Sequence, residues 1–141
     1  ECLGAVNLLY GHVQVTSAKL TSVPAGMVRT YEMRGWTKFE SDVIDTKPAA
    51  PDRHGARNVL AVGCPIGVEW DKKSTMELSH TKRRPAVLPG RFEKELEERK
   101  ALCDARGVNL FTSGKDQPFI IKKYAETFQQ MIAHGVKIDY K

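Results

Sequence analysis

The sequence has few cysteines, scattered histidines and no long apolar run, and each of these shortages excludes a class of protein. Cys2, Cys64 and Cys103 are the only three cysteines in 141 residues. They are widely spaced and form no C-x-x-C pair, so we expect neither a disulfide framework nor a thiolate zinc site. The four histidines lack the spacing of metal ligands, and we predict no metal and no cofactor. Unpaired cysteines fit a reducing compartment.

The longest apolar run covers residues 59–68 and is interrupted by glycine and proline, whereas a membrane-spanning helix needs roughly 20 apolar residues. We therefore predict no transmembrane segment. A length of 141 residues, with 41% hydrophobic and 28% charged residues, predicts a single domain over 1–141. The first residue is Glu rather than Met and no signal-peptide pattern follows, so we expect a trimmed start, by removal of a transit peptide or by truncation.

The net charge of +5 is spread along the chain, and Lys82-Arg83-Arg84 is the one cluster of basic residues. Two interpretations of this cluster stay open. It is a solvated loop before Pro85, or it is an interaction site for phosphate, anionic lipid or an acidic protein partner. Nucleic acid is the weaker choice of ligand, because no aromatic residues interleave with the basic ones.

Hydrophobic periodicity predicts helices alternating with short strands. Apolar residues at helical spacing predict helices over 3–10, 35–47, 91–102 and 118–135, the last with Asp116 as its N-cap. Alternating or short apolar stretches predict strands over 13–16, 58–62 and 136–140. The predicted fold class is α/β, with a partial flavodoxin-like sheet and a helical C-terminal extension.

The two predicted C-terminal helices have clear apolar faces. Phe92 and Leu96 share one face of the first, where Glu95 and Arg99 have the i,i+4 spacing of an ion pair. A broad apolar stripe follows the second helix, and we interpret it as core packing; its residues are Ile120, Ile121, Tyr124, Phe128, Met131 and Ile132.

Two motifs that suggest catalysis fail on inspection. Gly114-Lys115 resembles the end of a phosphate-binding loop, but Asn109 stands in place of the upstream glycine, and Asp116 replaces the required Ser or Thr. Cys64 lies beside Pro65 in an apolar run, where a cysteine is typically a small core residue rather than a nucleophile.

The segment from Tyr31 to Glu40 places a carboxylate beside an aromatic residue. Glu40 lies one turn after Trp36 on the predicted helix, at the edge of its apolar face. Partial burial would raise the pKa of Glu40, and Arg29 or Arg34 nearby would lower it. A carboxylate held in this way could orient a ribose hydroxyl or act in acid–base chemistry, and the structural alternative is an Arg/Glu clamp that fixes the start of the helix.

The strand at 13–16 and the run Arg34-Gly35-Trp36-Thr37-Lys38-Phe39-Glu40 together resemble a segment of Toll/interleukin-receptor (TIR) domains, in which a strand precedes a helix opening with W-x-x-x-E. The chain is still more similar to an uncharacterised group of protist proteins, known from algae and their relatives. That group has R-G-W-x-x-F-E followed by P-x-x-F, F-T-x-G-K-D and Y-x-x-x-F. The downstream residues here are Pro89, Phe92, Phe111-Thr112-Ser113-Gly114-Lys115-Asp116, Tyr124 and Phe128.

The TIR resemblance implies a TIR-like sheet and NAD cleavage with Glu40 as the catalytic residue. Two departures argue against that activity: Thr37 follows Trp36 where the family has Cys, and the chain begins after the first strand and loop of the family's nucleotide pocket. We therefore favour a non-enzymatic structural or interaction protein, an accessory subunit whose exposed sheet edges are covered by protein partners in a larger assembly. An organelle is one candidate location for that assembly, and NAD cleavage is the alternative function.

Overall fold

The computed structural model describes residues 9–12, 14–47, 59–62 and 84–133. The elements in these ranges are, in order, the strand β1 (Ser17–Leu20), the short 3-10 helix η1 (Tyr31–Met33), the helix α2 (Gly35–Asp45), the strand β2 (Val59–Val62) and the helices α4 (Pro89–Ala105) and α5 (Asp116–Ala133). The two strands form a parallel pair. The predicted α/β class is therefore confirmed.

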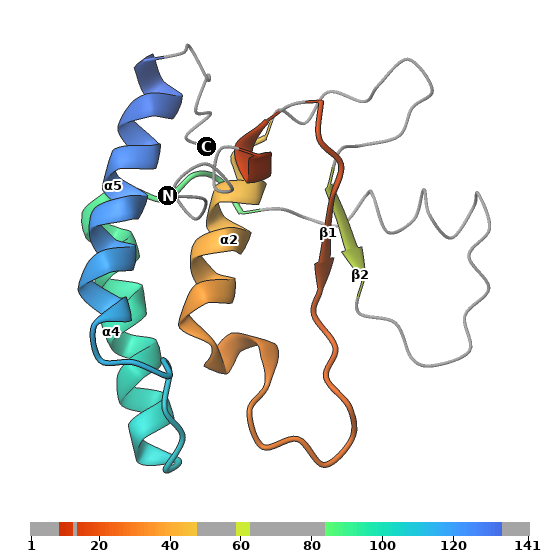
Figure 1. The fold of residues 1–141 in the computed structure, drawn as a ribbon, viewed down its shortest axis with the longest axis vertical. Coiled ribbons are helices and arrows are strands. Elements are labelled where there is room, and N and C mark those ends of the chain that lie inside the picture. Colours follow the sequence, from red (N-terminus) through yellow and green to blue (C-terminus); the bar gives the residue numbers. More distant parts are fainter. Residues whose placement is uncertain (1–8, 13, 48–58, 63–83, 134–141) are drawn as a thin grey trace, which may run out of the picture.

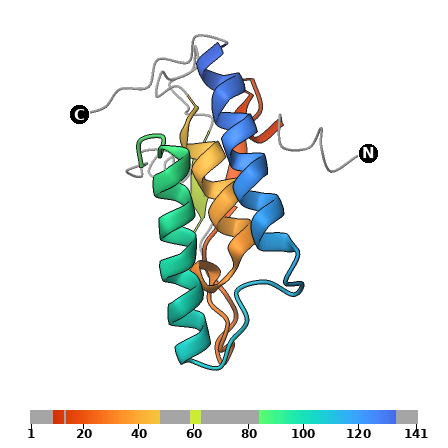
Figure 2. The ribbon, with the colours of Figure 1, turned by 90° about the vertical axis from the view of Figure 1, so that its left-hand side faces the viewer.

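The described elements form three layers, which Figure 1 shows from the side. The sheet is one outer layer, α2 is the middle layer, and α4 and α5 form the other outer layer. Figure 2 shows α4 and α5 side by side in front of α2. Helix α2 is thus enclosed on two opposite sides.

The main core lies between the three helices and is built from their apolar stripes, which are Phe39 and Val43 of α2, Phe92 and Leu96 of α4, and Ile120, Tyr124 and Phe128 of α5. The rings of Phe92 and Tyr124 stack with centroids 4.0 Å apart. The Tyr124 hydroxyl donates a hydrogen bond to the Val87 carbonyl at 2.8 Å. The prediction of these stripes as core is confirmed for the residues above. In the predicted stripe of α5, Ile121 and Met131 are only partly buried, and the prediction is wrong for Ile132, which is 52% exposed.

The first strand begins later than the sequence predicts. Residues 14–16 are not strand, and β1 starts at Ser17. His12 explains the delay, because its carbonyl accepts the Val15 N–H at 3.1 Å and its Nδ1 accepts the Gln14 N–H at 3.2 Å. These bonds hold the chain in a turn where the alternating residues would otherwise extend. The prediction of a strand over 13–16 is therefore wrong for its described residues.

Helix α2 begins at a glycine for a steric reason. A Cβ built on Gly35 would lie 2.0 Å from Cε1 of Phe111, far inside any real contact distance. The Gly35 N–H donates a hydrogen bond to the Leu110 carbonyl at 3.0 Å. The loop before α5 therefore sits directly on the first turn of α2, and only a residue without a side chain fits there.

The other helices and β2 agree with the prediction within a few residues. Strand β2 spans Val59–Val62 where 58–62 was expected. Helix α4 is longer than predicted, because it starts with Pro89 in its first turn and continues to Ala105. It ends before Gly107, whose φ of 66° permits the left-handed C-terminal cap. Of the predicted helix over 3–10, residues 9 and 10 are described and are helical, while residues 3–8 and the predicted strand at 136–140 lie outside the described residues.

Candidate functional site

Glu40, the residue suggested by the TIR resemblance, lies on α2 and is half-buried. Its Oε1 accepts a hydrogen bond from the Tyr10 hydroxyl at 3.4 Å. Burial raises the pKa of the Glu40 carboxyl, and the Tyr10 bond lowers it only in part. The predicted effect of burial is therefore confirmed, and a larger fraction of this carboxyl is protonated at a given pH than in an exposed glutamate.

The arginines expected near Glu40 do not bind it. Arg29 donates hydrogen bonds to the carbonyls of Met33 at 3.2 Å and Leu110 at 2.7 Å. Arg34 precedes α2, and its Nε is buried without a hydrogen-bond partner. The predicted Arg/Glu clamp is wrong, because the guanidinium of Arg29 fixes the loop before α5 instead.

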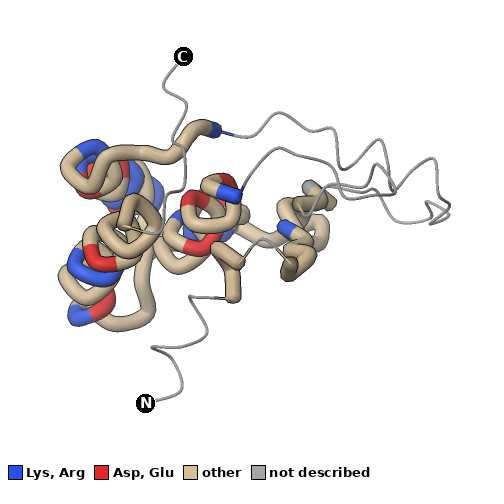
Figure 3. The backbone as a smooth tube through the Cα atoms, turned by 90° about the horizontal axis from the view of Figure 1, so that it is seen from above, with Lys and Arg blue, Asp and Glu red and all other residues tan. Residues whose placement is uncertain are grey.

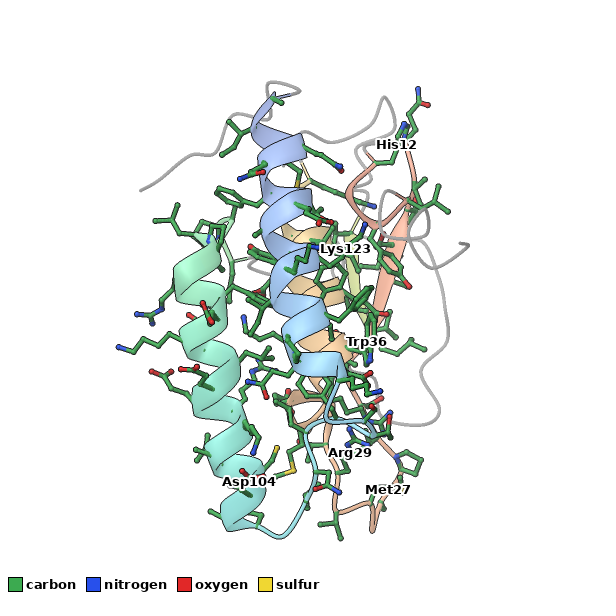
Figure 4. All side chains as sticks on the ribbon, turned by 60° about the vertical axis from the view of Figure 1, so that its left-hand side comes forward. His12, Met27, Arg29, Trp36, Asp104 and Lys123 are labelled. Atoms are coloured by element: carbon green, nitrogen blue, oxygen red, sulfur yellow. The ribbon has the colours of Figure 1, made fainter. Side chains whose placement is uncertain are left out.

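Trp36 lies one turn before Glu40, beside the start of α5 (Figure 4). Its ring is 6.1 Å from that of Phe119 between centroids, and its Nε1–H donates to Oδ2 of Asp116 at 3.4 Å. Asp116, predicted as the N-cap of this helix, is the first residue of α5 itself, and its carboxylate accepts this tertiary hydrogen bond. Trp36 packs between α2 and α5, and this places Glu40 near, but not inside, the core.

The groups around Glu40 limit the chemistry that it can perform. The titratable neighbours are the phenols of Tyr10 and Tyr31, and burial raises the pKa of both hydroxyls. A half-buried carboxyl beside two phenols can hold a hydroxyl-bearing ligand by hydrogen bonds. In the described part of the chain, no group of three or more His, Cys, Asp or Glu side chains could hold a metal ion.

Of the predicted basic site Lys82-Arg83-Arg84, only Arg84 lies among the described residues. Its two terminal nitrogens donate to the two oxygens of Glu95 at 3.1 and 2.9 Å. This hydrogen bonding raises the pKa of Arg84. Arg84 is therefore a structural anchor that ties the segment before α4 to the helix itself, although its side chain stays 53% exposed.

The sequence analysis missed a buried ion-pair network between α2 and α4. The Lys38 ammonium binds Asp42 one turn along α2 and binds Oε2 of Glu95 at 2.9 Å. It also lies 5.0 Å above the centre of the Phe92 ring. The Lys38 side chain is fully buried and those of its two partners nearly so.

The two carboxylates of this network respond to it differently. Burial raises the pKa of Asp42, and Lys38 offsets only part of the rise. Burial alone would also raise the pKa of Glu95, but hydrogen bonds from Arg84, Arg91 and Lys38 hold it well below its usual range. The predicted pair between Glu95 and Arg99 is wrong, because Arg99 donates to the Glu32 carbonyl instead.

A second polar seam joins α2 to the sheet. Lys19 of β1 binds Asp45 at 2.5 Å and donates to the Ser41 hydroxyl at 3.2 Å. Lys47, just after α2, donates to the Ser17 hydroxyl at 2.6 Å. Figure 3 shows that all three long helices carry charges of both signs. Lys47 and Asp45 therefore use their charges in contacts between α2 and the sheet.

Two further absences hold within the described part of the chain. None of its helices is both long enough and apolar enough to cross a membrane. Cys103, the one cysteine it includes, is buried and forms no disulfide.

Comparison with known proteins finds no relative of this chain. No family model matches it, and neither a curated protein nor a solved structure matches it significantly. The TIR and protist resemblances therefore stay predictions.

Proposed function

We propose that this chain is a non-enzymatic structural or interaction protein, an accessory subunit that docks on protein partners in a larger assembly. The observation that carries the proposal is the sheet. Helix α2 covers one face of the parallel β1–β2 pair, and no described element lies on the other face (Figures 1 and 3). Parallel sheets occur almost only with both faces covered. A flavodoxin-like or TIR-like sheet, to which we assign these strands, has this requirement.

The face of the sheet that points away from α2 is apolar. Side chains alternate along a strand, so Ser17 and Lys19 face α2 while Ala18 and Leu20 face away from it. Both outward residues of β1 are exposed, Leu20 to 67%, whereas Val62 of β2, the register partner of Leu20, is only 7% exposed. The exposed part of this face is therefore its β1 side. We assign these exposed apolar side chains of β1 to the area that a partner covers.

The buried charges support the same function. Lys38, Asp42 and Glu95 bind one another, and Lys19 binds Asp45. Charges in these positions hold the layers together, and such ion-pair networks are a common structural use of buried ionisable groups. The half-buried carboxyl of Glu40 takes no part in these networks and has no cationic partner among the described residues.

Native size tests the accessory-subunit proposal. We expect the protein in a gently prepared extract of its source to elute far above its own mass of 15.8 kDa, together with a constant set of partners. Leu20→Glu should abolish this elution, and the matched variant Leu88→Glu, on a residue 54% exposed before α4, should preserve it. Elution as a free small species would contradict the proposal.

The second candidate is NAD cleavage by Glu40, which the raised pKa of its half-buried carboxyl favours. Water would attack the ribose carbon that bears nicotinamide, releasing nicotinamide and ADP-ribose, with Glu40 holding a ribose hydroxyl. The assay is nicotinamide release by the purified protein. This function is supported if Glu40→Gln abolishes turnover while the exposed control Glu93→Gln preserves it. It is eliminated if turnover survives Glu40→Gln, or if the protein shows no turnover at all.

A further inference from the structure

We propose that an extended segment of a partner polypeptide adds a strand beside β1, on the edge opposite β2. The inference rests on the proposed function, since it names the way in which the partner is held. Strand addition gives affinity through main-chain hydrogen bonds, whereas pockets for side chains give specificity.

The register of the sheet shows which main-chain groups point to this edge. Ser17 pairs with Val59 and Leu20 with Val62, and the Thr21 N–H donates to the Val62 carbonyl at 3.1 Å. In a parallel ladder, alternate residues direct both their N–H and their C=O to the same neighbour. Thr21, and Lys19 with it, therefore bond toward β2, while Ala18 and Leu20 direct their main-chain groups to the opposite edge.

No described segment lies alongside this edge, and the four residues of β1 include neither a proline nor an unpaired charge that would block pairing. Figures 1 and 3 show no described segment alongside it, and both Ala18 and Leu20 are exposed. Proteins protect free edges with proline, bulges or charged side chains that project over the edge. The strand Ser17–Leu20 contains no proline, and the ammonium of Lys19, its one charge, is held by Asp45 at 2.5 Å.

The two faces beside β1 define the chemistry of the added segment. On the α2 side the new strand would lie next to Ser17 and Lys19, where polar side chains find partners. On the other side it would lie next to Ala18 and Leu20, where apolar side chains extend the exposed surface. The partner segment should therefore alternate polar and apolar residues, and it would add a strand to the two that the structure describes, which alone form a marginal sheet.

Hydrogen exchange, resolved amide by amide, tests the proposal in the full chain. In the dilute purified protein we expect the amides of Ala18 and Leu20 to exchange fast and those of Lys19 and Thr21 to exchange slowly. In the native assembly the Ala18 and Leu20 amides should slow by at least about tenfold. Slow exchange of Ala18 and Leu20 in the dilute protein would show that this chain covers its own edge, and would overturn the proposal. Slow exchange that appears only on concentrating the pure protein would assign the edge to a second copy and would overturn it too.

A proline variant provides the second measurement. Ala18→Pro removes an outward N–H and leaves the β1–β2 bonds in place, as proline does on free edges, and Ala18→Val is the matched control that keeps the N–H. We expect Ala18→Pro to leave the assembly and Ala18→Val to remain in it, with unchanged circular dichroism for both free proteins. If Ala18→Pro fails to fold, the exchange measurement decides alone.

The two proposals fail in different ways. A chain that never enters an assembly contradicts the proposed function and the strand addition together. A chain that enters the assembly while its Ala18 and Leu20 amides still exchange fast contradicts the strand addition alone.

Discussion

Replacing Lys38 with methionine should leave the buried carboxylate of Asp42 without its cationic partner. Lys38 lies between Asp42 and Glu95, and its side chain has no exposed surface. Methionine fills a similar volume, so the change removes charge rather than packing. Glu95 keeps hydrogen bonds from Arg84 and Arg91 in the variant, whereas Asp42 loses the ammonium that binds it.

The cost follows from the protonation of Asp42. An unpaired buried carboxylate becomes neutral instead of staying charged. Protonating an aspartate with an ordinary pKa of 3.8 costs about 4 kcal/mol at pH 7, at about 1.36 kcal/mol for each pKa unit. That value is an upper limit, and it agrees with the roughly 3–5 kcal/mol lost when one partner of a buried ion pair is removed. At pH 5 the same step costs only about 2 kcal/mol.

Urea denaturation of four proteins measures this effect. We expect Lys38→Met to lose about 3–4 kcal/mol at pH 7 and about half of that at pH 5. The double variant Lys38→Met/Asp42→Leu removes both charges and should lie within about 1–2 kcal/mol of the wild type. The control Lys100→Met breaks the exposed pair with Asp104, roughly half exposed on both sides, and should change stability by less than about 1 kcal/mol.

Two results would refute this reasoning. If Lys38→Met loses no more unfolding free energy at pH 7 than Lys100→Met does, the buried ion pairs of Lys38 stabilise the fold no more than an exposed pair. If the loss of unfolding free energy is large but equal at pH 5 and pH 7, it comes from lost packing and not from the unpaired carboxyl of Asp42.

Three further predictions concern other parts of the described structure. Gly35→Ala should destabilise the fold by about 1–3 kcal/mol through overpacking. Gly90→Ala should not, because nothing lies near an added Cβ there. Equal urea midpoints for the two variants would contradict this prediction. The lowered pKa of Glu95 means that its charge stabilises the fold above its ordinary pKa of 4.5 and that this stabilisation is lost as the pH falls below it. Glu95→Gln should therefore show a shallower loss of stability in acid than the wild type, and an equally steep loss would refute the assignment. Tyr10→Phe should raise the pKa of Glu40 further, because the Tyr10 hydrogen bond lowers it; carboxyl NMR titration showing no rise would contradict that bond.

The parts of the fold that the sequence predicts well are those set by local periodicity. The stripes through Phe92 and Leu96 and through Ile120, Tyr124 and Phe128 repeat at helical spacing, and all of these side chains are buried. Helical burial needs only one apolar face and one neighbour. The apolar stripe of a helix does not show which element covers it. The helices are therefore predictable from the sequence, while their arrangement is not.

The buried network escaped the sequence analysis because hydropathy assigns charged residues to the surface. Lys38 and Asp42 flank the apolar stripe of α2, and their partner Glu95 lies 57 and 53 positions further along the chain. One signal was present: Glu95 follows Phe92 by three residues and precedes Leu96, so it lies within the buried stripe of α4. A carboxylate in that position needs a cation from another element.

The neighbours of Glu40 were mispredicted for a related reason. Arg29 and Arg34 are close to it in sequence, but proximity in sequence says little once the chain turns. Two main-chain carbonyls bind Arg29, and the phenol that contacts Glu40 comes from Tyr10, thirty residues earlier. Tertiary hydrogen bonds of single residues leave no periodic trace in the sequence.

The charges on α4 also fix how the helix lies against α2. Glu95 accepts the ammonium of Lys38, and the residues one turn before and one turn after it are Arg91 and Arg99. A shift of α4 by one turn in either direction would therefore bring a guanidinium to the buried Lys38 in place of a carboxylate. Like charges in a buried site cost several kcal/mol in order-of-magnitude terms, so both shifted packings are strongly disfavoured. The contact between Lys38 and Glu95 therefore selects one register of α4 against α2, which an apolar contact at this position would not do through charge.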